Sequence, residues 1–363
     1  MVFWAKCKDG FRRTVEEHLK DSAHVAKELY GDFLSDGLRK QLPLAICVFA
    51  AAAHDIGKAS PAFQNYIQKV NKDNQPRHWL ISYRFLIRKE FDKSLALVLA
   101  SHHGTPPDIE TLKALDTGGK DRPCGFKDHV YIAEQERLLA LALDEAGIGL
   151  DEAKAIKLDK PRQVLLSGFL VLCDWIASGR AEGGEDHGLT EPWKSAGFRA
   201  DETYGRLLGG NAPRPVQAAV ADIFARANKP GLIIIEAPMG EGKTEAALAA
   251  AEAMAERSNR GGLFFALPTQ ATSNAMFSRV RDWLEKLKLQ EPHTIDLVHG
   301  RKLANSEFKK MYGRGFATDG EPEDMLSVNS WTQNRKKALF SNFVVGTVDH
   351  LLMAALKQKH FML

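Results

Sequence analysis

The chain has 363 residues, of which 49 are basic and 46 acidic, so its formal net charge is only +3. Nearly balanced charge excludes a general polycation, and any contact with nucleic acid must come from local patches. The four cysteines form no Cys-x-x-Cys pair, which argues against a zinc knuckle and against a disulfide framework. A chain of this length favours two domains of ordinary size.

Neither the N-terminus nor the longest apolar stretch indicates secretion or a membrane span. Residues 1–10 carry mixed charge instead of a basic head followed by an apolar run. The longest apolar stretch, residues 164–177, is too short to cross a bilayer and contains Asp174. We therefore expect a cytoplasmic protein without membrane contact, and we expect a monomer.

The first half of the chain has the periodicity of helices. From residue 12 to about residue 180, apolar side chains such as Ala26, Tyr30 and Phe33 recur at helix spacing, and no alternating strand pattern interrupts them. The sequence predicts an all-α domain over residues 1–180. Residues 181–215 are rich in glycine and proline and have no sustained apolar period, which is typical of a linker.

After residue 215 short apolar runs alternate with helical patterns, which predicts a partial α/β lobe with a parallel sheet over residues 216–363. The expected strands are residues 232–236, 263–267, 295–298 and 343–345, and the expected helices are 243–257 and 272–287. Residues 309–334 are polar and weakly patterned, so we expect a surface excursion there.

Candidate metal ligands stand at recurring helix ends in the first domain. A single histidine is more often a hydrogen-bonded core residue than a ligand, but an ordered set reverses that expectation. Asp174 lies in the apolar run 170–176, where an unpaired carboxylate would cost several kcal/mol to bury. The candidates are His18, His54, Asp55, His78, His102, His103 and Asp174.

These residues suggest a pair of divalent ions bridged by Asp55. As a hypothesis, His18, His54 and Asp174 complete one shell, and His78, His102 and His103 complete the other. Two adjacent ions suit phosphodiester cleavage, since one can activate a water and the other can stabilise the leaving oxygen. Imidazole-rich ligation favours Fe, Mn, Co or Ni over Mg.

Two further side chains could contact a phosphate near this centre. Lys58, one turn after Asp55, could offer positive charge to the scissile group, or it could be a solvated lysine at a helix start. Ser178, one turn after Asp174, could contact the same DNA phosphate or cap the helix end. We therefore predict Asp55 and Lys58 as catalytic residues.

A glycine-rich turn in the second domain predicts a nucleotide site for ATP and Mg. It lies between an expected strand and an alanine-rich helix, the context that a P-loop requires, although Ala237 occupies the position of the usual first glycine. Backbone N–H groups of such a turn surround phosphates, and the threonine hydroxyl holds magnesium. The residues are Gly240, Glu241, Gly242, Lys243 and Thr244.

Segments around the P-loop resemble motifs of superfamily 2 helicases. The segment before the P-loop, residues 213–217, is similar to the adenine-reading motif, which implies that Gln217 bonds the adenine edge. Thr269 and Gln270 follow one expected strand and Thr347 follows another, and these segments resemble motifs that hold the DNA backbone.

The seven candidate ligands, with Gly57 and Lys58, resemble the HD superfamily of metal-dependent phosphohydrolases, and the sequence Ser101-His102-His103-Gly104 is similar to its nuclease branch. With the helicase motifs behind it, the chain resembles the CRISPR-associated helicase-nucleases of type I systems. That resemblance implies cleavage of single-stranded DNA and recruitment to a guide-RNA surveillance complex of the Cascade type.

Helicases of this kind carry an Asp-Glu pair on a later strand and a second lobe, and neither follows residue 345 here. We therefore expect a chain that ends within the first RecA-like lobe, and from it DNA cleavage without ATP hydrolysis or unwinding. Two alternatives stay open. The chain could be an HD-type nucleotide phosphohydrolase with a regulatory P-loop, or a non-catalytic fragment that binds DNA.

Overall fold

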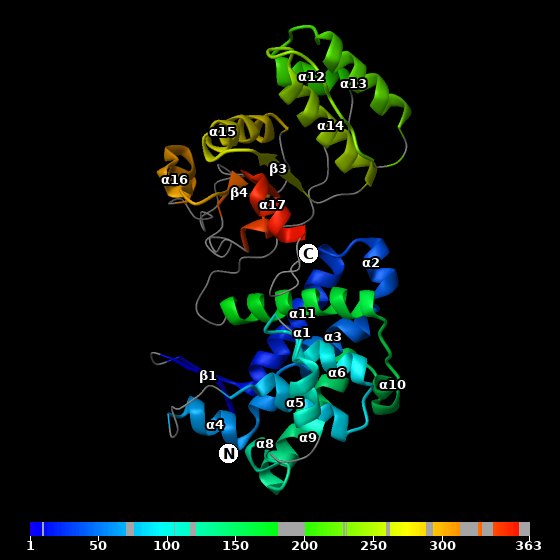
Figure 1. Ribbon diagram of the computed structural model, residues 1–363, viewed down its shortest axis with the longest axis vertical. Helices are drawn as coiled ribbons and strands as arrows, with labels where there is room; N and C mark the ends of the chain where they lie inside the picture. Colours follow the sequence, from blue (N-terminus) through cyan, green and yellow to red (C-terminus); the bar gives the residue numbers. More distant parts are fainter. Residues whose placement is uncertain are drawn as a thin grey trace, which may run out of the picture. The chain divides into compact units, whose positions relative to one another are not determined.

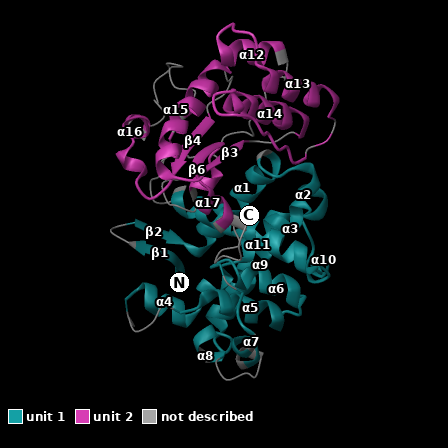
Figure 2. Cartoon of the chain, turned by 45° about the horizontal axis from the view of Figure 1, so that its top comes forward, with its two compact units in different colours: residues 1–186, 354–363 teal, residues 187–353 magenta. Residues whose placement is uncertain are grey.

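The computed structural model of the chain divides into two compact units, residues 1–186 with 354–363, and residues 187–353 (Figure 2). The structure describes residues 1–8, 11–69, 76–104, 106–116, 121–180, 200–227, 229, 231–258, 262–287, 293–312, 326–328 and 337–355. A helical unit precedes an α/β unit with a parallel sheet, which confirms the predicted fold class. None of the helices in these ranges is long and apolar enough to span a bilayer.

The first unit is a set of helices preceded by a short antiparallel hairpin that the sequence did not predict (Figure 1). Its strands have only five and four residues, too few for a recognisable alternation. The elements are β1 (Trp4–Lys8), β2 (Phe11–Thr14), α1 (Val15–Asp32), α2 (Asp36–Gln41), α3 (Leu44–Ala53), η1 (Ile56–Lys58), α4 (Pro61–Ile67), α5 (His78–Arg88), α6 (Lys93–Ala100), α7 (Ile109–Asp116), α8 (Asp121–Cys124), α9 (His129–Ala146), α10 (Leu150–Lys154) and α11 (Lys160–Arg180).

Helix α3 is the centre of this unit. Every residue from Cys47 to Ala53 is buried, and α3 packs against α1, α9 and α11. Because four of these residues are alanines, the neighbouring helices can approach the α3 backbone closely. The helix ends at His54, and Asp55 begins the 3-10 turn η1, so these two polar residues are delivered into the interior.

The second unit contains a parallel four-stranded sheet in the order β3-β6-β4-β5. The strands predicted at residues 263–267, 295–298 and 343–345 are confirmed, as are the helices that became α14 and α15. The elements are α12 (Ala200–Leu208), α13 (Pro215–Arg226), α14 (Lys243–Ser258), β3 (Leu263–Leu267), α15 (Gln270–Lys286), β4 (His293–Val298), η2 (Lys302–Ala304), α16 (Ser306–Tyr312), β5 (Leu326–Ser327), η4 (Lys337–Phe340), β6 (Phe343–Thr347) and α17 (Val348–Ala355).

The strand predicted at residues 232–236 is wrong, because this segment pairs with no strand in the described part of the sheet. Its side chains do alternate: Ile233 and Ile235 pack on the cluster formed by α13 and α14, whereas Leu232 and Ile234 are 90% and 75% exposed. The alternation of apolar side chains therefore reflects one buried and one exposed face of this segment. It does not predict whether a neighbouring strand pairs with the segment.

The predicted linker at residues 181–215 needs a correction as well. Helix α12 lies inside it, packs against α14, and buries Tyr204, whose hydroxyl donates to the Gln217 carbonyl oxygen at 2.6 Å. Because α12 has only nine residues and is flanked by glycines and prolines, its apolar periodicity was not recognisable in the sequence. Residues 181–199 lie outside the described residues, as does most of the polar excursion at 309–334.

The sheet provides a test of how the second unit is stabilised. Phe343 in β6 is fully buried, and its ring meets the Trp283 ring edge-on with the centroids 6.3 Å apart. We expect Phe343→Ala to lower the free energy of unfolding of this unit by about 3–5 kcal/mol. Differential scanning calorimetry would measure the change. Ile223→Ala, at a side chain that is 51% exposed on α13, is the control, and an equal effect of both substitutions would contradict the assigned core.

Candidate metal centre and nucleotide loop

The seven predicted ligands come from five helices of the first unit and meet in its interior. Their ligand atoms form two groups, in each of which all the atoms lie within 4.8 Å of one another. The first group is His18 from α1, His54 and Asp55 from the end of α3, and Asp174 from α11. The second is His78 at the start of α5 with His102 and His103, which follow α6.

The carboxylate of Asp55 lies between the two groups and is almost completely buried. Its Oδ2 is 3.0 Å from Nε2 of His18 and 3.2 Å from Nε2 of His54. Its Oδ1 is 3.1 Å from Nε2 of His78 and 3.4 Å from Nε2 of His102. Each oxygen thus faces a different group, which is the arrangement expected of a ligand that bridges two ions.

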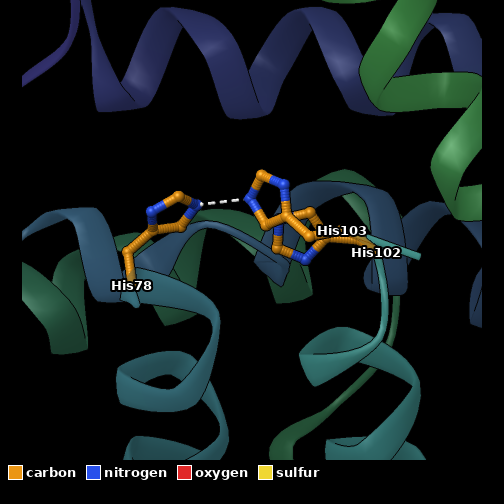
Figure 3. Close-up of side chains that lie close together, drawn as sticks. All are labelled: His78, His102 and His103. Atoms are coloured by element: carbon orange, nitrogen blue, oxygen red, sulfur yellow. Dashed lines mark hydrogen bonds between the residues drawn. The ribbon is translucent and has the colours of Figure 1, made fainter. Parts of the chain in front are cut away.

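The remaining two residues complete the groups from the more open side. Asp174 Oδ1 is 3.3 Å from Nε2 of His18 and 3.7 Å from Nε2 of His54, and its side chain is 15% exposed. Figure 3 shows the imidazoles of His78 and His103 pointing toward one another, with their Nε2 atoms 3.0 Å apart. His103 is partly exposed, so the centre is accessible near this residue.

Two of the imidazoles are oriented by the helices that they terminate. Nδ1 of His54 donates to the Ala51 carbonyl oxygen at 2.8 Å, and Nδ1 of His102 donates to that of Leu99 at 2.6 Å. Their Nε2 atoms therefore face Asp55, and within the described residues these Nε2 atoms and Asp55 Oδ1 make no hydrogen bond. Buried imidazole nitrogens opposite a carboxylate require a metal ion or a proton between them, so the donor set fits a pair of metal ions.

The pKa values of the buried histidines differ between the two groups. Burial alone would lower the pKa of His54, but the carboxylates of Asp55 and Asp174 raise it to about 10. Burial would likewise raise the pKa of Asp55, yet His54 and Lys58 hold it well below its usual value. In the second group burial lowers the pKa of His78 to about 4 and that of His103 to about 3. A proton therefore occupies the first group, and these two histidines of the second are neutral.

The turn η1 reaches the second group because Gly57 has no side chain. A Cβ at this position would lie 2.1 Å from the His78 carbonyl oxygen. The Gly57 N–H donates to Ser82 Oγ at 2.9 Å, which fixes η1 against α5. Sequence reasoning singled out Gly57 only as part of a motif, and it missed Ser82, which no local pattern distinguishes from an ordinary core serine.

The two predicted phosphate contacts beside the centre have defined partners. Lys58 Nζ is 2.6 Å from Asp55 Oδ2, and the side chain is only 14% exposed, so the reading of Lys58 as a solvated lysine is wrong. Ser178 Oγ donates to Asp174 Oδ1 at 3.2 Å. The hydroxyl of Ser178 thus bonds a candidate ligand, and its contact with DNA stays a prediction.

The glycine-rich turn of the second unit, which the sequence predicts to be a P-loop, is closed by its own lysine. Gly240 and Gly242 have φ angles of 82° and 80°, which side chains strongly disfavour. Lys243 Nζ donates to the carbonyl oxygens of Ala237 at 2.5 Å and of Pro238 at 2.7 Å. Because α14 begins at Lys243, an incoming phosphate would meet the N-terminus of a helix of 16 residues.

The neighbours of this turn belong to α13 and α15. Gln217 is buried, accepts from the Arg214 N–H at 2.8 Å, and donates from Nε2 to the Gly242 carbonyl oxygen at 3.2 Å. Its amide therefore supports the loop, and one Nε2 hydrogen is left for a base. Glu241 lies 3.8 Å from Arg214, and Thr244 Oγ1 accepts from Arg279 at 3.4 Å.

The three predicted DNA contacts of this unit lie at the carboxyl edge of the sheet. β3 and β6 are parallel, and their register pairs Leu267 with Thr347, so Thr269 and Gln270 follow at the same edge. Thr269 accepts from the Thr272 N–H and caps α15, and Thr347 Oγ1 is 3.0 Å from Nδ1 of His350. Gln270 is exposed. The structure brings these residues to one edge, and their contact with DNA stays a prediction.

Comparison with known proteins relates both units to one group of enzymes. Residues 4–181 match the family model described as "Cas3, HD domain". A CRISPR-associated nuclease/helicase Cas3 of Streptococcus thermophilus is 32% identical, over 99% of this chain and 47% of the relative. A CRISPR-associated endonuclease/helicase Cas3 of Thermus thermophilus is 29% identical, over 99% and 44%.

A solved structure shares the fold. The crystal structure of T. fusca Cas3-ATP superposes with a TM-score of 0.73 at 24% identity, covering 99% of this chain and 44% of that one. The chain spans about half the length of the curated relatives named above.

The proton on His54 predicts the pH linkage of metal binding. At pH 7.5 a group with a pKa of about 10 is protonated, so Mn²⁺ must displace that proton, and we expect release of about one proton as the first group is filled. Isothermal titration calorimetry in buffers of different ionisation enthalpy would measure the release. We expect His54→Asn to abolish it and His103→Asn, where the imidazole is already neutral, to preserve it. Unchanged release in His54→Asn would contradict this assignment.

Proposed function

Because residues 4–181 match the family model of the Cas3 HD domain, we propose that the first unit is a metal-dependent nuclease that hydrolyses single-stranded DNA. The observation that carries the proposal is the bridging position of Asp55, whose two oxygens face two separate sets of imidazoles. Phosphodiester hydrolysis uses paired cations in this way, so the geometry supports the activity that the family implies.

The two groups divide the proposed binding of metal between them. His18, His54 and Asp174 would hold one ion, His78, His102 and His103 would hold the other, and Asp55 would join both. The paired ions would supply an activated water and stabilise the leaving oxygen. Five imidazoles among seven ligands favour Fe, Mn, Co or Ni over Mg, which prefers oxygen.

The chain's own residues would position the DNA phosphate. Lys58 places an ammonium group at the edge of the buried centre, where it can attract the negative charge that develops on the phosphate oxygens. The ion pair of Lys58 with Asp55 would also keep the Asp55 carboxylate ionised before a metal ion binds. Ser178, from its contact with Asp174, would lie beside the same phosphate.

The second unit would bind ATP with Mg at Lys243 and Thr244, with Gln217 at the adenine and Glu241 in the loop. We propose that Thr269, Gln270 and Thr347 hold the DNA backbone at the carboxyl edge of the sheet. The relatives are about twice as long as this chain. In a protein of that length, nuclease action would be coupled to ATP-dependent unwinding. The partner of this protein would be a Cascade-type guide-RNA complex. The protein would bind that complex as a monomer in the cytoplasm.

The nuclease assignment is tested with circular single-stranded DNA and added Mn²⁺, Co²⁺ or Ni²⁺. We expect Asp55→Ala to lower the rate of cleavage at least about 100-fold, because it removes the one ligand shared by both groups. Electrophoresis of the circle would follow the reaction. Equal degradation by the wild type and Asp55→Ala would overturn the assignment.

The same experiment separates a nuclease from a nucleotide phosphohydrolase. The wild type is given deoxynucleoside triphosphates in place of DNA, with the same metal, and phosphate release is measured. Rapid phosphate release with an intact DNA circle would support the nucleotide enzyme instead. Incomplete metal occupancy without either reaction would indicate a non-catalytic fragment that binds DNA.

The P-loop makes a separate prediction. Lys243→Ala should weaken binding of ATP with Mg²⁺ at least about tenfold, because the ammonium that now caps two loop carbonyls would otherwise pair with the phosphates. Calorimetric titration would measure the affinity, and Lys286→Ala, an exposed lysine at the end of α15, is the control. Unaltered affinity in Lys243→Ala would show that the loop is not the nucleotide site.

A further inference from the structure

We propose that Gln64 is a positioning residue of the nuclease centre, which holds the backbone of Lys58 so that the lysine ammonium stays at Asp55. The proposal rests on the nuclease function proposed above. Gln64 is 2% exposed and lies on α4, outside the seven ligands. Within the described residues its amide makes no hydrogen bond to any of them.

The Gln64 amide is held by three hydrogen bonds. Nε2 donates to the Lys58 carbonyl oxygen at 2.9 Å and to that of Trp4 at 2.9 Å, and Oε1 accepts from the Trp4 N–H at 3.0 Å. Both Nε2 hydrogens are thereby used. A buried amide with all its hydrogens engaged has one orientation, so it can transmit the position of one segment to another.

One end of this link is the hairpin at the start of the chain. The amide of Gln64 pairs with both the N–H and the carbonyl oxygen of Trp4, as a neighbouring strand would do. The pairing of β1 with β2 is irregular between Trp4 and Lys6, so the side chain bonds β1 where the ladder changes register. Through Gln64 the hairpin becomes a fixed support for η1.

The other end is Lys58, which α4 contacts twice. Gln64 bonds its carbonyl oxygen, and the ring of the adjacent Phe63 lies beneath its ammonium, with Nζ 5.7 Å from the ring centroid. The same ammonium is 2.6 Å from Asp55 Oδ2. Since η1 has only three residues, a small rotation of the turn would displace Nζ from this position.

The distinguishing consequence is kinetic. Asp55, Asp174 and the imidazoles are held by α1, α3, α5, α6 and α11, so loosening Lys58 should leave metal affinity within about threefold of the wild type. The rate constant of cleavage should fall about 10- to 100-fold, because misplacing a charged group by about 1 Å has effects of that size. KM for the DNA circle should change less than kcat.

The test is a double-mutant cycle with Mn²⁺ and circular single-stranded DNA. Gln64→Met keeps the side-chain volume and removes all three hydrogen bonds, and Lys58→Met removes the ammonium. If Gln64 acts through Lys58, the double variant should have the kcat of Lys58→Met alone. Multiplication of the two effects in the double variant would overturn the proposal.

Two further variants guard the interpretation. Gln64→Asn keeps an amide that is one methylene too short for both partners, and it replaces Gln64→Met if that variant does not fold. Gln163→Met is the matched control. Gln163 lies on another helix, α11, and its amide donates to the Leu158 carbonyl oxygen at 2.8 Å. A loss of kcat in Gln163→Met equal to that in Gln64→Met would overturn the proposal as well.

Asp55→Ala, measured in parallel, distinguishes a failure of the proposed nuclease function from a failure of the proposed role of Gln64. Activity retained in Asp55→Ala would remove the proposed nuclease function. Inactive Asp55→Ala together with wild-type kcat in Gln64→Met would leave the nuclease function and remove only the role of Gln64.

Discussion

The first unit depends on one buried carboxylate surrounded by imidazoles. Asp55 carries a negative charge in the interior, with the Nε2 atoms of His54 and His102 directed at it. Such an arrangement is unfavourable unless positive charge enters it, as a proton on His54, as the ammonium of Lys58, or as metal ions. The small side chains of α3, the short turn η1 and the ends of α5 and α6 all serve to bring these groups within contact.

Much of this centre could be predicted from sequence because its ligands occupy recognisable places. His54 and Asp55 follow an apolar run, and Asp174 interrupts another, so burial without a partner was implausible at each. The assignment of each imidazole to one oxygen of Asp55 was beyond the sequence, because it depends on how five helices pack. Gln64 was missed for the same reason, since its partner Trp4 is sixty positions away.

The second unit shows where periodicity informs and where it fails. β3, β4 and β6 were found because apolar runs bounded by polar turns are typical of buried strands. Residues 232–236 have the same run but no pairing in the described sheet, and exposed Leu232 and Ile234 demonstrate that alternation alone does not make a strand. Tyr204 and α12 escaped notice because a single short helix among glycines has too little pattern.

The distance between η1 and α5 depends on the absence of a Cβ atom at Gly57. Gly57 lets two backbones touch, and a methyl group there would wedge η1 away from the first turn of α5. Asp55 would then keep His18 and His54 while losing His78. A single carbon atom at this position would therefore decide whether the proposed centre could hold two ions or only one.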